Sequence, residues 1–264
     1  MRLRAAQAGL SAGIGAALFL HPTDLRLQAE EGSLLAPLCF VGLILSSVAL
    51  YFVVSLMDPG FVRSHPEHTK PASALQESGS KGQEILAFQQ DVPEVRLRRC
   101  GYCLLKQPMR AKHCRECRHC VRRYDHHCPW IENCVGERNH RLFVLYLAVQ
   151  LVVVVWAMEA SWSGLGPLPA SFSWPWLRQN LLLLLCFLVL LVCAVVAALL
   201  LASHAYLAAC NTTTWEFMSR HRISYLRGCP EEENPFDRGV FRNLWGFFCA
   251  RRSVRWEALH PSAV

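Results

Sequence analysis

Cysteines and histidines gather in one stretch of the chain, where they could bind metal or carry a covalent intermediate. Seven cysteines and four histidines lie between Cys100 and Cys134, and the end of this segment reads HCRECRHCVRRYDHHCPWIENC. Two C-x2-C pairs, Cys100/Cys103 and Cys114/Cys117, have the spacing with which a tight turn presents two thiolates to one tetrahedral ion. The segment has few aliphatic residues, so bound zinc would supply folding free energy that its small core cannot.

The number of ligands leaves open whether one cysteine is free. Two tetrahedral zinc ions need about eight protein ligands. Seven cysteines with one histidine would occupy all coordination positions of both ions and leave no thiol over. Six cysteines with two histidines would also do so and would leave one cysteine unbound. The spacing fits both partitions, so a purely structural zinc domain is an alternative at this point.

The sequence from Asp125 to Cys128, DHHC, favours chemistry at Cys128. A nucleophilic thiol needs a base within reach and a third group that orients the base. Cys128, His126 and Asp125 offer these three groups. A thiol beside an imidazole is partly ionised at neutral pH. Cys128 also shortly precedes an apolar run, so we expect it at a membrane surface, where it can meet an acyl thioester whose tail is in the bilayer.

Three long apolar runs and a shorter one predict membrane helices. Roughly 20 apolar residues cross a bilayer as a helix, and the runs at Leu34–Met57, Leu142–Met158 and Leu181–Ser203 come close to or exceed this length. Ala5–Leu20 is shorter and rich in Gly and Ala. Two arginines before it make a signal peptide the alternative. No small-x-small cleavage site follows the run directly, which favours a retained fourth span.

The distribution of basic residues predicts the orientation. Of 27 Lys and Arg, 25 fall in the segments that four spans would place on one side, and only Arg26 and Arg178 fall on the other. The positive-inside rule makes the basic side, with both termini, cytosolic. We interpret the net charge of +7 as attraction to anionic headgroups, and we expect no nucleic-acid partner. In the reducing cytosol, clustered cysteines indicate metal binding or catalysis rather than disulfides.

The predicted fold class is an all-α polytopic membrane protein, with four transmembrane helices and a small cytosolic cysteine-rich domain that binds two zinc ions. Residues 58–95 are polar and poor in large apolar residues, which predicts a flexible cytosolic linker. The predicted parts are two helices with a short lumenal loop in 1–57, the linker in 58–95, the zinc-binding catalytic domain in 96–141, two helices in 142–203, and a cytosolic C-terminal region in 204–264.

These motifs resemble the DHHC family of protein S-acyltransferases, or palmitoyltransferases. The resemblance covers the whole cysteine-rich segment and extends to three further elements. DPG at Asp58–Gly60 follows the second apolar run. TTxE at Thr213–Glu216 follows the fourth. The stretch NPFDRGVFRNLWGFF contains Asn243, the counterpart of a characteristic family asparagine.

The resemblance implies a ligand partition and a reaction. One zinc ion would be bound by Cys100, Cys103, His113 and Cys120, and the other by Cys114, Cys117, His127 and Cys134. Cys128 is then the thiol left over. The implied reaction is a two-step, ping-pong transfer of a palmitoyl group from palmitoyl-CoA to Cys128 and then to a cytosolic cysteine of a substrate protein. His126 would act as the base and Asp125 would orient it, with Thr214 and Asn243 in support.

The resemblance also implies where the substrates lie. The acyl tail would lie among the four helices, near membrane lipid, and the CoA phosphates would remain cytosolic. The candidate contacts of CoA are Arg98, Arg99, Arg110 and Lys112. Family resemblance indicates the Golgi apparatus, with the endoplasmic reticulum second. Two rival functions, a non-catalytic zinc-bearing membrane scaffold and a zinc-dependent ubiquitin-ligase adaptor, are disfavoured by the complete Asp125, His126 and Cys128 set and by the TTxE element.

Overall fold

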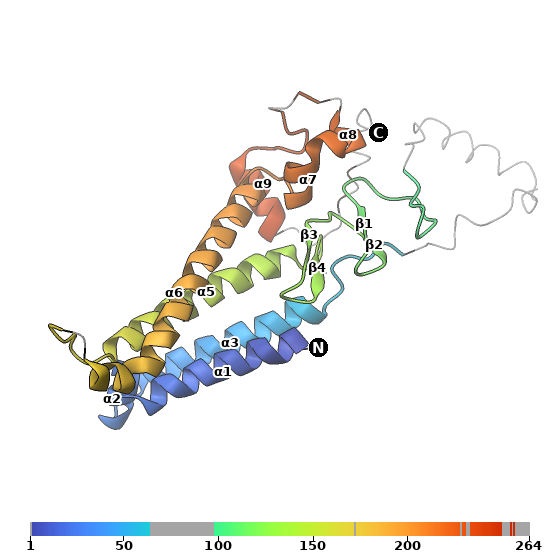
Figure 1. Ribbon diagram of the computed structural model, residues 1–264. Coiled ribbons are helices and arrows are strands. Elements are labelled where there is room, and N and C mark those ends of the chain that lie inside the picture. The colour runs from blue at the N-terminus through green and yellow to red at the C-terminus, as the bar shows by residue number, and fades with distance from the viewer. Residues whose placement is uncertain are drawn as a thin grey trace, which may run out of the picture.

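The computed structural model is mostly helical, with four long helices and a small cysteine-rich segment at one end (Figure 1). It describes residues 2–63, 98–171, 173–227, 229–230, 233–249, 254 and 256. The predicted linker therefore lies outside the described residues from residue 64 onward. The long helices are α1 (Arg2–Leu20), α3 (Leu35–Leu56), α5 (His140–Ser163) and α6 (Trp174–Ala209).

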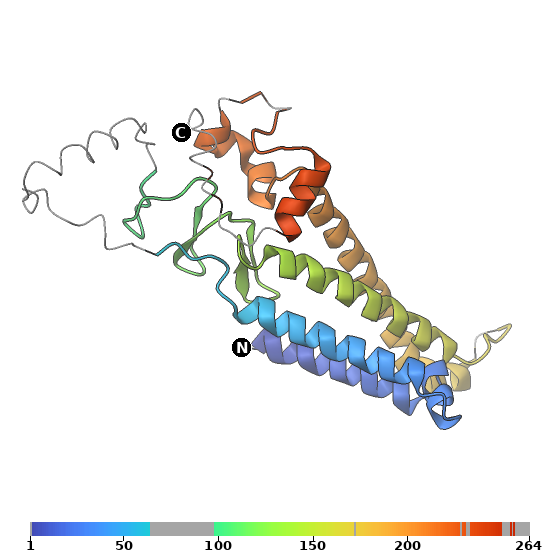
Figure 2. The ribbon, with the colours of Figure 1, turned by 180° about the vertical axis from the view of Figure 1, so that it is seen from behind.

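All four long helices have the length and apolar composition needed to cross a membrane. The short first run thus forms a helix, α1, as the retained-span interpretation requires. Helix α6 is longer than the predicted run, with 36 residues. At about 1.5 Å per residue it extends ~54 Å, well beyond the ~30 Å hydrocarbon layer. Its C-terminal end therefore extends past the start of α5 and meets α9 of the C-terminal region (Figures 1 and 2).

The core of the bundle forms where α5 packs between α3 and α6, with α1 alongside α3. Phe40 of α3 is fully buried and meets the ring of Trp156 edge to face, with ring centroids 5.5 Å apart. Leu183 and Leu190 of α6 belong to the same apolar cluster. The short helix α2 (Asp24–Glu30) connects α1 and α3 at the end away from the cysteine-rich segment (Figure 1).

The cysteine-rich segment contains two small β-hairpins that the all-α prediction does not include. Strands β1 (Lys112–Cys114) and β2 (His119–Val121) pair antiparallel, as do β3 (His126–Cys128) and β4 (Asn133–Val135). Isolated two-stranded hairpins are marginally stable in water. Strands of three residues therefore need other interactions to hold them in place.

The C-terminal region lies at the same end of the bundle as the hairpins (Figure 2). It contains α7 (Thr214–Ser219), the 3-10 turn η3 (Arg220–Arg222), α8 (Ser224–Arg227) and α9 (Val240–Phe248). The buried side chain of Asn243 donates to the carbonyl of Ala209, at 2.7 Å, and to Asp237. Asn243 thereby fixes α9 against the end of α6.

Gly136, directly after β4, lies where the hairpins and the DPG stretch approach most closely. A Cβ atom there would sit 2.6 Å from Val121 Cγ1 and 2.7 Å from the carbonyl oxygen of Pro59. We expect Gly136→Ala to lower the free energy of unfolding by about 1–3 kcal/mol, because the added methyl overpacks the site. Thermal unfolding of the detergent-solubilised protein measures this change. Gly42→Ala, whose Cβ meets nothing within 4 Å, is the control and should not lower the midpoint.

Candidate active site and metal centres

The first metal cluster is formed by Cys100, Cys103, His113 and Cys120, whose ligand atoms all lie within 4.8 Å of one another. His113 Nδ1 is 3.2 Å from Cys103 Sγ and 3.9 Å from Cys120 Sγ. His113 and Cys120 face each other as the central pair of the β1–β2 hairpin. The backbone N–H of Cys103 donates to Cys100 Sγ at 3.4 Å, which favours a thiolate there.

The second cluster has the same composition and plan. Cys114, Cys117, His127 and Cys134 converge within 4.8 Å, and His127 and Cys134 are the central pair of the β3–β4 hairpin. Cys117 Sγ lies 3.4 Å from His127 Nδ1 and 3.3 Å from Cys134 Sγ. The backbone N–H of Cys117 donates to Cys114 Sγ at 3.4 Å.

The donor sets fit one tetrahedral ion each. Zinc–sulfur bonds near 2.3 Å and zinc–nitrogen bonds near 2.0 Å place neighbouring ligands about 3.5–3.8 Å apart, close to the separations in both clusters. Burial and the adjacent thiols raise the pKa of Cys134 far above its ordinary value. Such a thiol ionises only with a cation beside it. Each cluster could therefore hold a metal ion, and the ligands are those that the family resemblance implies.

Strand β3 separates the metal ligand from the candidate catalytic groups. Successive side chains of a strand point to opposite faces, so His127 turns toward the second cluster while His126 and Cys128 share the other face. His126 Nδ1 lies 2.7 Å from Asp125 Oδ2. The carboxylate is 1% exposed, and it also accepts from Thr214, through the backbone N–H to Oδ1 at 2.9 Å and the hydroxyl to Oδ2 at 2.8 Å.

The electrostatics of these groups favour a thiolate beside an imidazolium. Burial opposes the charged form of His126, but hydrogen bonds to Asp125 and Cys128 outweigh it and raise the pKa of His126 to about 9. Burial likewise works against the Cys128 thiolate. The hydrogen bonds from His126 and from the backbone of Ile131 and Trp130 overcome this effect and lower the pKa of Cys128. The pair is therefore poised as base and nucleophile.

The turn that follows Cys128 is fixed to the C-terminal end of α3. The hydroxyl of Ser55 donates to the carbonyl of Ile131 at 2.6 Å. Asn133 donates from its side chain to the carbonyls of Val54, at 3.1 Å, and Met57, at 2.9 Å. Tyr51 adds a hydrogen bond to the carbonyl of Trp130. These contacts hold Cys128 at the end of the helical bundle where α3 ends and α5 begins. There its side chain joins an apolar cluster with Phe143, Tyr146 and Leu147 of α5.

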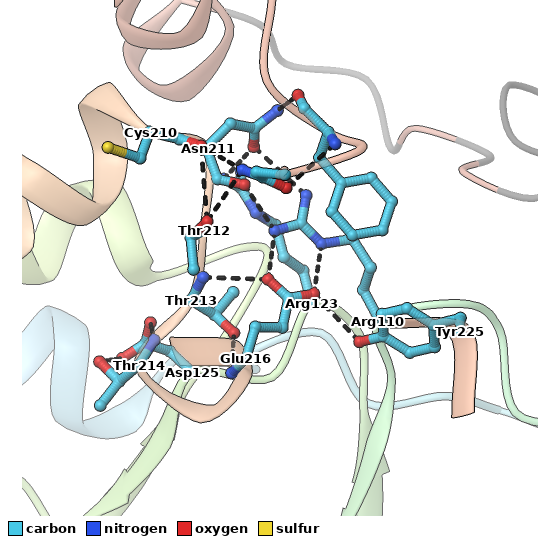
Figure 3. A network of polar contacts seen from close by, with 12 residues as sticks. Arg110, Arg123, Asp125, Cys210, Asn211, Thr212, Thr213, Thr214, Glu216 and Tyr225 are labelled. Carbon is cyan, nitrogen blue, oxygen red and sulfur yellow. Dashed lines mark hydrogen bonds and ion pairs between the residues drawn. The ribbon is translucent and has the colours of Figure 1, made fainter. Parts of the chain in front are cut away.

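A buried ion pair joins the cysteine-rich segment to the C-terminal region (Figure 3). Arg110 is fully buried, and its Nε and Nη2 lie 2.7 and 2.5 Å from the two carboxylate oxygens of Glu216. Asn211 accepts from Arg110 through both its side chain and its backbone carbonyl. Asn211 also accepts from Arg123 at 2.8 Å, and Tyr225 donates to Glu216 at 3.0 Å.

The TTxE element has a physical explanation in this network. Thr213 and Glu216 form a capping box at the start of α7: the Thr213 side chain accepts from the backbone N–H of Glu216, and the Glu216 carboxylate accepts from that of Thr213. Thr214, the first residue of α7, takes no part in this capping box, and its hydroxyl donates to Asp125. The same carboxylate of Glu216 binds Arg110. One short motif thus caps a helix, supports the candidate triad and closes the buried ion pair.

The predicted CoA contacts lie in different environments. Arg98 and Arg99 are exposed. Lys112 is half-buried above the rings of Tyr124 and Trp215, at 5.1 and 5.0 Å from their centroids. The interpretation of Arg110 as a phosphate contact is wrong for this structure, because its guanidinium is fully buried and already paired with Glu216.

Two buried histidines near Asp125, His140 and His204, were missed by the sequence reasoning. His140 begins α5 and His204 lies in α6, and both are 4% exposed or less. Their Nε2 and Nδ1 atoms are 3.0 Å apart. Each is a single histidine at the edge of an apolar run, and nothing in the local spacing indicates that the two meet. The available signal was only that a polar side chain at such a position is seldom buried without a partner.

Comparisons with known proteins agree on one family. The family model described as DHHC palmitoyltransferase matches residues 94–221. Human palmitoyltransferase ZDHHC12 is 54% identical over 95% of this chain and 88% of its own length, and the mouse protein of that name is 53% identical over 98% and 91%. Protein S-acyltransferase 10 of Arabidopsis thaliana is 32% identical over 82% and 72%. The DHHC stretch and the NPFDRG element predict a particular similarity to the twelfth mammalian member, and these identities confirm it.

The buried ion pair predicts a large effect of Glu216→Gln on stability. The change leaves the Arg110 charge buried without its counter-charge, which costs about 3–5 kcal/mol. Unfolding of the solubilised protein should show this loss. Glu30→Gln breaks the exposed Arg26–Glu30 pair and should change stability by less than about 0.5 kcal/mol. Equal effects of the two substitutions would contradict the buried-pair interpretation.

The lowered pKa of Cys128 predicts alkylation at a pH where an ordinary thiol, with a pKa near ~8.5, is protonated. Burial raises the pKa of Cys128, and His126→Ala removes the hydrogen bond and the positive charge that lower it. The midpoint of the alkylation profile at Cys128 should then rise by about 1–3 pH units. Iodoacetamide labelling of the Cys128 peptide, followed by mass spectrometry, measures it. His221→Ala, which removes an exposed histidine, should leave the profile unchanged.

Proposed function

Since the chain belongs to the DHHC palmitoyltransferase family, we propose that it is a protein-cysteine S-palmitoyltransferase that uses Cys128 as its acyl carrier. One observation carries the residue assignment. Eight ligands fill the two metal clusters, and the remaining cysteine of the segment stands beside an imidazole that is itself held by a buried carboxylate. This arrangement supplies a nucleophile, a base and an orienting group in the required order.

In the proposed first step, the Cys128 thiolate attacks the thioester carbonyl of palmitoyl-CoA. The new carbon–sulfur bond forms at Cys128, the bond to CoA breaks, and the His126 imidazolium gives its proton to the departing CoA thiolate. In the second step, His126 accepts the proton of a substrate cysteine, which attacks the acyl-Cys128 thioester. Cys128 leaves as the thiolate, so the two substrates react in turn, in ping-pong order.

We assign two structural zinc ions to the metal clusters. Three cysteines and one histidine fill all four positions of each tetrahedral site, and a closed site has no position for a reacting water. The ions would contribute folding free energy to a segment of three-residue strands. Their ligands would also hold β3 so that His126 and Cys128 face away from the second cluster.

The proposed membrane placement puts both termini and the cysteine-rich segment in the cytosol, in the Golgi apparatus or, second, the endoplasmic reticulum. The charge distribution along the chain supports the orientation. The apolar cluster around Cys128, made by side chains of α3 and α5, supports an acyl chain that descends among the helices. Substrates would be cytosolic or membrane proteins with an accessible cysteine, and exposed Arg98 and Arg99 are the proposed contacts of CoA phosphates.

Autoacylation with a clickable palmitoyl-CoA analogue tests the proposal. The purified wild-type protein should acquire a label that hydroxylamine removes, because a thioester is cleaved by hydroxylamine. Cys128→Ser should lose the label entirely and keep both zinc ions, measured by metal analysis of the same samples. Cys134→Ser removes a ligand and should lose zinc as well as label. Cys249→Ser, at an exposed cysteine, should keep both.

Other outcomes would overturn particular parts of the proposal. Equal labelling of wild type and Cys128→Ser would place the acyl group on another cysteine. Zinc loss in Cys128→Ser would make Cys128 a ligand and reverse the partition. A folded wild-type protein with two zinc ions and no label would favour the non-catalytic scaffold. Ubiquitin transfer that survives Cys128→Ser would favour the ligase adaptor.

A further inference from the structure

The feature that the proposed reaction leaves unused is a pair of buried imidazoles beside the Asp125 carboxylate. His140 Nε2 lies 3.0 Å from His204 Nδ1. The other nitrogen of His140, Nδ1, lies 3.8 Å from Asp125 Oδ1. Among the described residues, none forms a hydrogen bond with this buried Nδ1 atom. A buried polar atom without a hydrogen bond is costly unless a nearby charged group stabilises it electrostatically, and the Asp125 carboxylate can do so for an N–H at this position.

A metal ion is a poor explanation of this group, although Asp125, His140 and His204 offer three possible ligands. A coordinated ion needs its donors to converge on one point. One donor atom of each residue lies within 4.8 Å of the others, but the two nitrogens of the His140 ring face different partners: Nε2 lies 3.0 Å from His204 and Nδ1 lies 3.8 Å from the carboxylate. The three groups therefore form a chain with His140 in the middle, and Asp125 already accepts three hydrogen bonds from Thr214 and His126.

The geometry selects one arrangement of protons along this chain. A short contact between two neutral imidazoles carries one proton. If His140 Nε2 were the donor, its Nδ1 would present a lone pair to the Asp125 carboxylate, and both would be electron-rich. If His204 Nδ1 is the donor, His140 carries its proton on Nδ1 and directs a positive N–H dipole toward Asp125. Only the second arrangement is attractive at both ends.

We propose that His140 and His204 are positioning residues of the catalytic carboxylate, with His204 donating to His140 and His140 directing its Nδ1–H toward Asp125. This inference deepens the proposed acyltransferase function and rests on it. Within hydrogen-bonding distance, Asp125 Oδ2 has two donors, Thr214 Oγ1 and His126 Nδ1, whereas Oδ1 has only the backbone N–H of Thr214. His140 directs the positive end of its Nδ1–H dipole toward Oδ1, at an N–O distance of 3.8 Å.

The consequence is control of the carboxylate that orients His126. With donors on both oxygens, the carboxylate plane is held so that Oδ2 accepts from His126 Nδ1–H and leaves Nε2 of His126 for Cys128. Without the His140 dipole, Oδ1 keeps only the backbone N–H of Thr214, so the carboxylate plane is held less firmly. Small displacements of a catalytic group carry large rate penalties. The short polar contacts of this histidine pair are with each other and with Asp125, so we assign their effect on His126 to Asp125.

Two substitutions of His140 separate its polar role from its packing. The His140 ring also packs edge to face on Phe247, with centroids 4.9 Å apart, so His140→Phe keeps an aromatic ring and removes both nitrogens. His140→Asn places an amide nitrogen near the position of Nδ1. We expect the initial rate of Cys128 autoacylation to fall on the order of 10-fold or more in His140→Phe, and to recover most of the wild-type rate in His140→Asn. The same comparison is made at His204, the next residue of the hydrogen-bonded series. His204→Leu should slow autoacylation, and His204→Asn should keep most of the wild-type rate.

Zinc content and unfolding temperature of each variant are measured alongside the rate. Wild-type rates in a folded His140→Phe protein with two zinc ions would overturn the inference. Equal slowing in His140→Phe and His140→Asn, with zinc retained, would overturn the assigned donor. Failure of the proposed function looks different, because then the wild-type protein itself acquires no label.

The tautomer can be measured in the wild-type protein, without dependence on how a variant folds. Protonated and bare ring nitrogens have well-separated ¹⁵N chemical shifts, and spectra of His140→Asn and His204→Asn assign the signals of histidine-labelled protein. The proposal requires a proton on Nδ1 of both His140 and His204. A bare Nδ1 on His140 would overturn it.

Discussion

The convergence of thiol and imidazole groups on two points is the constraint on which the rest of the active-site architecture depends. Each hairpin has strands of three residues, and in each the central pair is a histidine and a cysteine of one cluster. The two clusters are interleaved along the chain, because Cys114 and Cys117 lie in the first hairpin and complete the cluster of the second. Neither cluster can therefore form from one hairpin alone, and the positions of Asp125, His126 and Cys128 depend on both hairpins.

The cysteine-rich segment is then joined to the rest of the molecule by polar contacts on two sides. Toward the helical bundle, the carbonyls that end α3 accept from Asn133, and Ser55 donates a hydrogen bond to the turn after Cys128. Toward the C-terminal region, Glu216 binds Arg110 and Thr214 binds Asp125. The carboxylate that orients His126 is thus shared between segments that are 89 residues apart. The active site is complete only when helical bundle, hairpins and C-terminal region are all in place.

The features that could be predicted from the sequence are those that depend on residues close together in the chain. Apolar runs predict long helices because crossing a bilayer sets their length, and C-x2-C spacing predicts metal clusters because a turn sets the distance between two thiols. The hairpins were missed because their strands carry the cysteines and histidines of the two clusters rather than a strand-like apolar pattern. Arg110 was predicted to contact CoA because its partner in the fold is 106 residues away, and no local pattern distinguishes a buried arginine from an exposed one. The extension of α6 and the contact of His140 with His204 likewise depend on helix packing.

Strand β3 also limits how this segment can change over evolutionary time. His127 belongs to the second cluster, while its two neighbours, His126 and Cys128, carry the proposed chemistry on the opposite face of the same strand. Substitution of one residue alters one of these roles. Insertion or deletion of a single residue would exchange the faces and abolish both at once, since the side-chain period of a strand is two. The length of this stretch is therefore less tolerant of change than the identity of its exposed side chains, such as Trp130, which is 73% exposed. A substitution at an exposed position leaves both faces of the strand in place, whereas a change in length does not.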